Sequence, residues 1–334
     1  MILVTGGTGL VGAHLLVELV KAETSVKAIY RSQSSLKKVE KIFSCYFKNY
    51  QEKINKIEWI TADLNDIPAL ENAFESVTHV YHCAALISFD PRDYDKLYKI
   101  NCEGTANIVN ISIAKNIQKL CYVSSIATIG KEVNNPQVTE ESEWSKNDAN
   151  VYALTKFDAE MEVWRGSQEG LPVIIVNPGI ILGPGFWETG SGAIFKAAAK
   201  GQSYYPPGGT GFVSVTDVVN IMLLGMKSTI NKERFILIAE NLSYKFILTE
   251  VAKCLNIKPP HKKLKAWQLS ILWRLDWFRG LFSSKKRKLT KNSVISLKEE
   301  TIYINHKATS AFNFQFKPIK ETIDFCCKKY VEEN

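Results

Sequence analysis

The first twelve residues constrain the fold more than any other part of this chain. They read MILVTGGTGLVG, in which the apolar run Ile2–Val4 precedes three glycines that recur every third residue. An apolar helical pattern follows at once, so the glycines lie between a predicted buried strand and a predicted helix. Such a turn lets a pyrophosphate approach the N–H groups of the helix start. The segment therefore predicts a dinucleotide site, an ordinary strand-to-helix turn being the alternative, and the expected contacts are Gly6, Thr8, Gly9, Leu10, Val11 and Gly12.

Strand-like and helical patterns alternate through the first two thirds of the chain. This alternation predicts an α/β fold with a doubly wound parallel sheet, the NAD(P)-binding Rossmann arrangement. We expect strands at 2–5, 26–30, 57–61, 78–82, 119–124, 173–177 and 234–238. We expect helices at 11–22, 34–48, 67–76, 94–115 and 151–168.

The alternation breaks after about residue 178, where loops rich in glycine and proline follow, and the pattern from 242 onward is mostly helical. We therefore predict a dinucleotide-binding domain formed by 1–178 and 212–241. A smaller, mainly helical substrate-binding lobe would be formed by 179–211 and 242–334. Such a lobe closes over the carboxyl ends of the strands, where doubly wound sheets bind their ligands.

Composition and spacing bear on whether the chain is a membrane-spanning, nucleic-acid-binding or metal-binding protein. No apolar run reaches the roughly 18 residues of a membrane-spanning helix, and we expect no signal peptide before the first strand. The formal net charge of +8 suits phosphate-bearing ligands but does not by itself indicate a nucleic-acid partner. The seven cysteines show no metal-binding spacing. We therefore expect no metal site, and free thiols in a reducing compartment, the cytoplasm.

The end of the second predicted strand indicates which nicotinamide cofactor binds. An NAD site commonly places Asp or Glu there, to bond the ribose 2′-hydroxyl. Here Arg31 follows the strand, and Lys38 comes seven residues later. Cations at this place neutralise a 2′-phosphate, so NADP(H) is favoured, with NAD(H) and a merely solvated basic face as alternatives. After the third strand, Asp63 is expected to accept from the adenine amino group and Leu64 to line the ring pocket.

Three residues are candidates for the chemistry. Tyr152 and Lys156 are four residues apart, so they share one face of a predicted helix. An ammonium beside a phenol lowers the pKa of the phenol, which suits proton exchange near neutral pH. Ser125 follows an apolar strand at the carboxyl edge of the sheet, where its hydroxyl can hold a carbonyl or an alcohol beside Tyr152. Ser124 is expected only to cap the strand and the turn.

Together these residues resemble the extended short-chain dehydrogenase/reductase superfamily, often labelled NAD-dependent epimerase/dehydratase. The resemblance runs from residue 1 to about 240, and within the superfamily it is most similar to the dihydroflavonol 4-reductase-like branch. The residues that carry it are TGGTGLVG (5–12), Asp63-Leu64, HCAA (82–85), Asn101 with Gly104-Thr105, YVSS (122–125), Tyr152 with Lys156, NPG (177–179) and GPG (183–185).

The resemblance implies roles for individual residues. Tyr152 would be the acid/base, Lys156 its pKa partner and a ribose ligand, and Ser125 the hydroxyl that orients the substrate. Arg31 and Lys38 would engage the 2′-phosphate. Further cofactor contacts would be made by Ala84, Ala85, Asn101, Pro178 and Gly179. The sequence departs from the family pattern at two places. Ala85 replaces the more usual Gly, and Thr216 stands before Asp217 where two acids are common, which leaves Asp217 as the structural acid. His82 is interpreted as structural.

The residues after Ser125 discriminate among reactions of this superfamily. Ile126 and Ala127 stand where nucleotide-sugar 4,6-dehydratases carry an Asp-Glu pair, and they offer no Cys or Lys for epimerisation beside a carbonyl. Simple hydride transfer remains. We expect NADP(H)-dependent reduction of a carbonyl, or oxidation of the alcohol, on a small and fairly hydrophobic substrate. The alternatives are a nucleotide-sugar 4-epimerase that retains NAD(P), and an NADP-sensing regulator without catalysis.

Two helical segments raise the question of larger partners. The segment 266–282 is aromatic and precedes the basic run Lys285–Lys288. We expect its apolar face to pack on the core, and peripheral contact with a membrane is the alternative. The helices at 94–115 and 151–168 carry apolar positions beyond one buried stripe, and related enzymes pair them, so a homodimer is expected. Those positions are Leu97, Ile100, Ile108, Ile111, Ala153, Phe157, Met161 and Trp164.

Overall fold

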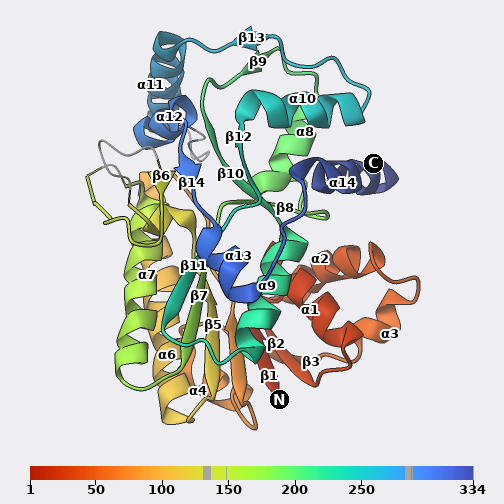
Figure 1. Cartoon of the computed structure of the whole chain (residues 1–334), viewed down its shortest axis with the longest axis vertical. Helices are drawn as coiled ribbons and strands as arrows, with labels where there is room; N and C mark the ends of the chain where they lie inside the picture. The colour runs from red at the N-terminus through yellow and green to blue at the C-terminus, as the bar shows by residue number, and fades with distance from the viewer. Residues whose placement is uncertain (131–136, 148, 283–286, 288, 334) are drawn as a thin grey trace.

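A seven-stranded parallel sheet forms the centre of the molecule in the computed structural model, which describes residues 1–130, 137–147, 149–282, 287 and 289–333. The strand order is β11-β7-β5-β4-β1-β2-β3, with helices on both faces (Figure 1). The expected doubly wound α/β fold is therefore confirmed. Its strands are β1 (Ile2–Thr5), β2 (Val26–Tyr30), β3 (Glu58–Thr61), β4 (His79–His82), β5 (Lys119–Val123), β7 (Val173–Pro178) and β11 (Glu233–Leu237).

Helices cover the two faces of the sheet as separate groups. One face packs against α1 (Leu10–Lys21), α2 (Gln33–Ser44), α3 (Tyr50–Ile54) and α9 (Val215–Lys227). The other face packs against α4 (Ile67–Ala73), α6 (Gly104–Ala114) and α7 (Val151–Gln168). The single helix expected at 94–115 consists of α5 (Tyr94–Leu97), a π-helical turn η2 (Tyr98–Glu103) and α6, with a short turn η1 (Pro91–Asp93) before it.

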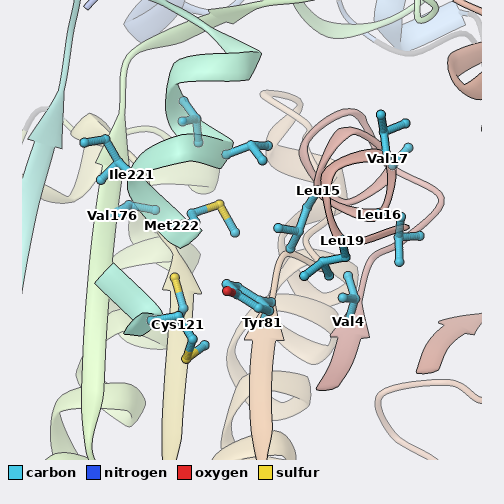
Figure 2. Close-up of a cluster of buried hydrophobic side chains, with 14 of the residues drawn as sticks. Val4, Leu15, Leu16, Val17, Leu19, Tyr81, Cys121, Val176, Ile221 and Met222 are labelled. Carbon is cyan, nitrogen blue, oxygen red and sulfur yellow. The ribbon is translucent and has the colours of Figure 1, made fainter. Parts of the chain in front are cut away.

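The core lies on both sides of the sheet, because successive side chains of a strand point to opposite faces. Val4 of β1 packs in the cluster that includes Leu16 of α1 and Met222 of α9, and Figure 2 shows these residues as part of one group of buried side chains. Leu3, one residue earlier, belongs to the cluster on the opposite face. Burial on both faces explains why the strands are apolar along their whole length.

The second lobe contains three small sheets and most of the helices of the C-terminal region (Figure 1). A three-stranded sheet has the order β12-β10-β8, and the two-stranded sheets are β13-β9 and β14-β6. The strands are β6 (Gln137–Val138), β8 (Ile180–Leu182), β9 (Tyr204–Tyr205), β10 (Gly209–Ser214), β12 (Glu240–Ser243), β13 (Lys262–Lys263) and β14 (Ile302–Tyr303). The helices are α8 (Ala193–Ala199), α10 (Tyr244–Cys254), α11 (Ala266–Phe282), α12 (Lys291–Lys298), α13 (His306–Phe312) and α14 (Ile319–Glu333), with short turns η3 (Ile126–Thr128) and η4 (Gly190–Gly192).

The chain passes between the large sheet and the lobe after β5, β6, β7, β10, β11, β14 and α13. The boundary expected at residue 212 falls inside β10. Helix α13, from the segment assigned to the lobe, packs on β11 and α9 of the large-sheet part. Its Phe312 ring lies 4.9 Å from the ring of Phe235, centroid to centroid. The expected division of the chain therefore describes the two parts only approximately.

Helix α11 corrects one expectation, since its apolar residues do not pack on the core. Leu269 is 1% exposed, but Leu275, Phe278 and Phe282 are 60%, 57% and 78% exposed. The apolar residues are distributed around this helix, so the neighbouring α12 can cover only part of them. Of the basic run that follows, Lys285, Lys286 and Lys288 lie outside the described residues. Among the residues that are described, no helix is long and apolar enough to cross a membrane.

Candidate active site

The glycine turn after β1 closely matches what a dinucleotide needs. Gly6 has a φ of +68°, and a Cβ there would lie 2.6 Å from the backbone of Ala84, so only glycine fits. The Gly9 N–H donates to the Gly6 carbonyl over 2.9 Å, and Gly9 precedes α1 without a side-chain cap. A Cβ on Gly12 would lie 2.2 Å from the same carbonyl oxygen, so Gly12 packs against the turn itself. The start of α1 can thus hold a pyrophosphate on backbone N–H groups.

The residues expected at the adenine ribose lie after β2 and β3, two neighbouring strands. Arg31 is 62% exposed, and its Nη1 lies 3.9 Å from Oδ2 of Asp63. The Lys38 Nζ lies 6.0 Å from the ring centroid of Phe186, in the loop after β8. Leu64 is buried, and its side chain faces Gly104 rather than an open pocket. Arg31 and Asp63 are therefore brought together, whereas Lys38 points toward the lobe.

The loop after β4 is held next to the glycine turn. The Ala84 N–H donates to Oγ1 of Thr5 over 3.3 Å. The side chain of Asn101 accepts from the Leu86 N–H over 2.7 Å and donates to the Leu86 carbonyl over 3.0 Å. Asn101 also donates to Thr155 over 3.2 Å. Asn101 therefore fixes the loop that contains Ala84 and Ala85 and acts on the site through this loop. It lies in the π-helical turn, a conformation frequent at functional sites.

Ser125 and Tyr152 meet at the carboxyl end of β5. Burial raises the pKa of Tyr152 to about 12, and a hydrogen bond with Ser125 opposes that rise. The ring of Phe89 packs edge-on against Tyr152, with centroids 5.8 Å apart. Ser125 also accepts from the Ala127 N–H over 3.2 Å at the start of the turn η3. A hydroxyl pair at the edge of the sheet with an aromatic wall can bind a carbonyl oxygen.

Lys156 does not act on Tyr152 as the four-residue spacing predicted. Its Nζ donates to the hydroxyl of Tyr122 over 2.5 Å and to the carbonyl of Val123 over 2.9 Å. Desolvation lowers the pKa of Lys156 to about 7, and the charge of Glu160 opposes this. The expected lowering of the pKa of Tyr152 is therefore wrong for this arrangement, because burial dominates and the ammonium is bonded to a second tyrosine.

Glu160 is a buried carboxylate that the sequence did not single out. It follows Lys156 by four residues, so the helical spacing already placed it on the same face of α7. Its side chain is fully buried, and Arg234 pairs with it at 3.1 Å. Its oxygens also accept hydrogen bonds from Ser124, Thr128, Trp164 and Asn177. The network fixes the strand end from which Ser125 projects, and Ser124 takes part in it as a structural residue.

His82 lies in a second buried network, next to Tyr122. Its Nδ1 lies 2.6 Å from Oγ1 of Thr5, and its Nε2 lies 2.9 Å from Oγ1 of Thr105. Burial lowers the pKa of His82 to about 3, so the ring is neutral. The ring stacks on Tyr122 with centroids 5.4 Å apart. His82 therefore links β1, β4 and α6 beneath the site, which fits its interpretation as structural.

The residues expected beside the nicotinamide lie at the end of β7. Pro178 is its last residue, and the Gly179 N–H donates to the Leu237 carbonyl over 3.2 Å. A Cβ on Gly179 would lie 2.4 Å from the carbonyl oxygen of Gly211, so the close approach of β10 requires glycine. Asp217 is fully buried and accepts from the Lys317 N–H over 2.8 Å, as expected of a structural acid.

The glycine turn after β1, the loop after β4, Ser125 after β5 and Pro178 at the end of β7 all lie at one edge of the sheet. This arrangement defines an NAD(P)-dependent enzyme with a Ser/Tyr/Lys site. Residues 2–239 match the model of the NAD-dependent epimerase/dehydratase family. The chain belongs to this family and is an NAD(P)-dependent oxidoreductase of the extended short-chain dehydrogenase/reductase type.

Individual relatives carry the names of reductases and epimerases. A Synechocystis sp. protein that carries the name of a dihydroflavonol 4-reductase is 30% identical over 281 residues, 81% of this chain and 77% of its own. Sterol demethylase protein B of Methylococcus capsulatus is 30% identical over 253 residues, 74% and 72% of the two chains. UDP-glucuronic acid 4-epimerase from Bacillus cereus, solved in complex with NAD, superposes with a TM-score of 0.75 at 16% identity, covering 99% of this chain and 98% of its own.

Proposed function

We propose that this protein is an NADP(H)-dependent reductase of a small, fairly hydrophobic carbonyl compound. The observation that carries the proposal is that Ser125, at the carboxyl end of β5, and Tyr152, at the start of α7, come together with Lys156 buried nearby. The residues that follow Ser125 are Ile126 and Ala127, which can neither abstract nor donate a proton. Such a site serves hydride transfer to a carbonyl, or from the alcohol.

The side chains divide the reaction between them. The reduced cofactor, when bound, would supply the hydride for the carbonyl carbon. Ser125 donates a hydrogen bond to the carbonyl oxygen and keeps it within reach of Tyr152. The hydroxyl proton of Tyr152 passes to that oxygen, so the carbonyl becomes an alcohol and the phenolate is reprotonated from solvent. Lys156, held by Tyr122 and Val123, would reach the ribose hydroxyls of the cofactor.

The protonation state of Tyr152 suits the donor role that reduction requires. With the pKa of Tyr152 raised to about 12, the phenol stays protonated at neutral pH and is ready to give its proton. Oxidation of an alcohol would require the phenolate, which this burial disfavours. Phe89 beside Tyr152 and the exposed Ile87 provide an apolar wall, which supports a hydrophobic substrate over a nucleotide sugar. The reductase names of several relatives agree with this direction.

Replacement of Tyr152 tests the chemistry. Positioned acid/base catalysis contributes about 10²–10⁴-fold, so Tyr152→Phe should lose at least about a hundredfold in kcat. Cofactor binding and the melting temperature should be retained. Turnover is followed as NADPH absorbance against a panel of ketones and aldehydes. The matched control is Tyr94→Phe, the same change at an exposed tyrosine outside the catalytic set, which should keep full activity.

Two results would contradict the reductase proposal. Full activity of Tyr152→Phe on a turned-over carbonyl would remove the tyrosine from the mechanism. Purification with tightly held NAD, combined with interconversion of UDP-sugars without consumption of added NADPH, would identify a nucleotide-sugar 4-epimerase. A complete lack of turnover with intact NADPH binding would instead identify a regulator that senses the cofactor.

The preference for NADP(H) is proposed from Arg31 and Lys38 after β2. Among the described residues, Arg31 has one ion-pair contact, a long and exposed one with Asp63, which leaves its guanidinium accessible to a 2′-phosphate. A charge-assisted hydrogen bond contributes about 1.5–3 kcal/mol, and the exposure of Arg31 places it at the low end. Arg31→Ala should therefore weaken NADPH binding about tenfold and leave NADH binding nearly unchanged, as measured by fluorescence titration. Lys41→Ala, which removes an exposed cation of α2, is the control, and equal affinity of the wild type for both cofactors would refute the preference.

We also propose a homodimer in the cytoplasm. The seven cysteines are free thiols, which supports a reducing compartment. The support for a dimer is the apolar surface left on η2 and α7, where Tyr98 and Met161 are exposed.

A further inference from the structure

Helix α11 presents an apolar surface of unusual size for its length. Three of the seven tryptophans of the chain lie on it, and it stands at the far end of the lobe from the large sheet (Figure 1). Its exposed large apolar residues are Trp267, Ile271, Leu272, Leu275, Trp277, Phe278 and Phe282. An apolar groove of about 650 Å³ continues this surface toward β9, between Tyr204, Pro206 and Leu264 on one side and Trp267, Ile271 and Leu272 on the other. A contiguous patch of this kind marks an interaction site.

The positive charge of the chain is concentrated in the stretch of sequence that contains α11. Residues 258–291 contain 11 of the 42 Lys and Arg residues but 1 of the 34 Asp and Glu residues. This stretch therefore carries a formal charge of +10, and the rest of the chain carries −2. Lys262 and Lys263 of β13 and Lys265 before α11 are exposed at one end of the helix, and Arg279 is exposed near the other. The partner of this face must accept both apolar side chains and a high positive charge.

We propose that α11 docks on the surface of an anionic lipid bilayer, lying in the plane of the interface. Tryptophan and phenylalanine partition into the boundary between headgroups and acyl chains, and lysine and arginine bind the anionic headgroups. A second copy of this chain does not fit, because a symmetric contact through α11 would bring two regions of charge +10 together. A nucleic acid would satisfy the cations but would leave the leucine and isoleucine side chains without an apolar partner.

The docking surface is joined to the catalytic site. The carboxylate of Asp90, which is 2% exposed, binds the Arg92 side chain and accepts from the Arg287 N–H over 2.9 Å. Arg92 in turn donates to the carbonyl of Gly280 in α11 over 3.4 Å. The loop fixed by these contacts contains Phe89, which packs on Tyr152. A bilayer at α11 therefore lies next to the loop that forms the apolar wall of the site.

Vesicle sedimentation tests the proposal with the full-length protein and without any substrate. The wild type should pellet with vesicles of phosphatidylcholine and phosphatidylglycerol, much less with phosphatidylcholine alone, and less as the salt concentration rises. Leu275→Gln/Phe278→Gln should reduce the bound fraction at least about tenfold. The matched control Ile67→Gln/Val331→Gln removes exposed apolar side chains from α4 and α14 and should bind like the wild type. Lys262→Gln/Lys263→Gln should weaken binding, and Lys227→Gln/Lys320→Gln should not.

Wild-type tryptophan fluorescence gives a measurement that needs no variant. Anionic vesicles should shift the emission to shorter wavelength, and lipids with brominated acyl chains should quench it. The proposal is overturned if the wild type does not bind these vesicles, or if the α11 double variant binds as well as the wild type. Retention by RNA without vesicle binding would identify a nucleic-acid surface instead. Conversion of a dimer to a monomer by Leu275→Gln/Phe278→Gln would identify a contact between copies.

Discussion

Tyr122 determines where the charge of Lys156 acts. The four-residue spacing of Tyr152 and Lys156 predicts neighbours on a helix, but it cannot predict which way a long side chain turns. In the structure the ammonium lies between the Tyr122 hydroxyl and the Val123 carbonyl, both from β5. Tyr122 is therefore a positioning residue for the catalytic lysine. Its hydroxyl accepts a hydrogen bond from the charged form of Lys156, which opposes the lowering of the lysine pKa by burial.

The pH profile of the reaction should show this role of Tyr122. If turnover depends on the charged form of Lys156, whose pKa is lowered to about 7, then kcat/KM falls as pH rises through this region. Tyr122→Phe removes an acceptor for the ammonium, lowers the lysine pKa further and should move the fall to lower pH. The matched control Tyr81→Phe alters a buried tyrosine of β4 on the opposite face of the sheet (Figure 2). Steady-state rates between pH 5 and 9 distinguish the two, and identical profiles for both variants would contradict the role.

Residues with a local signal were predicted better than residues with distant partners. Gly6 and Gly12 could be found because a turn between a strand and a helix restricts its backbone, and the structure gives each a steric reason. Glu160 could not be identified from the sequence, because its partners include Arg234, 74 residues later, and a single sequence does not show that contact. The pKa of Tyr152 was misjudged for a similar reason, since burial depends on the whole fold.

At the scale of elements, several apolar side chains of the helices expected to form a dimer are instead buried within their own chain. Leu97, Ile108, Ile111 and Ala153 are buried against the core. Phe157 is covered by Trp144, whose ring stacks on it at 3.8 Å. The surface that remains for a partner is formed by Tyr94, Tyr98, Ile100 and Met161, which is smaller than the sequence indicated but still apolar.

A single charge placed in this surface tests the dimer. Met161→Arg puts two cations opposite each other across a two-fold axis that passes near α7, and no compensating acid is introduced. Light scattering at micromolar concentration should give the mass of a dimer for the wild type and of a monomer for this variant. The control Leu224→Arg adds the same charge at a similarly exposed residue of α9 and should leave the dimer intact. A monomeric wild type would refute the assembly.

The strands were predicted well because burial on both faces leaves continuous apolar runs. Helix α11 was predicted as a helix, but its environment was not. An apolar face on a helix is normally covered by the core, and that general tendency led to the expectation of packing. What the sequence pattern could not show is that α11 lies at the end of the lobe, where α12 covers only part of it.

At the scale of the molecule, the doubly wound parallel sheet was predicted from the alternation of strands and helices, but the returns of the chain between the two parts were not. The predicted boundary at residue 212 lies inside β10, a strand that pairs with β8 and β12 of the lobe, and the helix directly after it packs on the large sheet. Helix α13 returns to β11 and α9 after the lobe has been built. Long-range returns of this kind leave no local mark in the sequence.

These repeated passages of the chain have a mechanical consequence. Five passages between the two parts, those after β7, β10, β11, β14 and α13, consist of described residues throughout. A hinge that opened the lobe would have to bend all five together, and none of these connections is longer than six residues. Domain closure in hinged proteins instead concentrates large backbone changes in a few residues. These five short connections therefore oppose a hinge motion of the lobe, and we expect the site to keep its shape when ligands enter. Selectivity then depends on the shape of a site that exists before the substrate arrives.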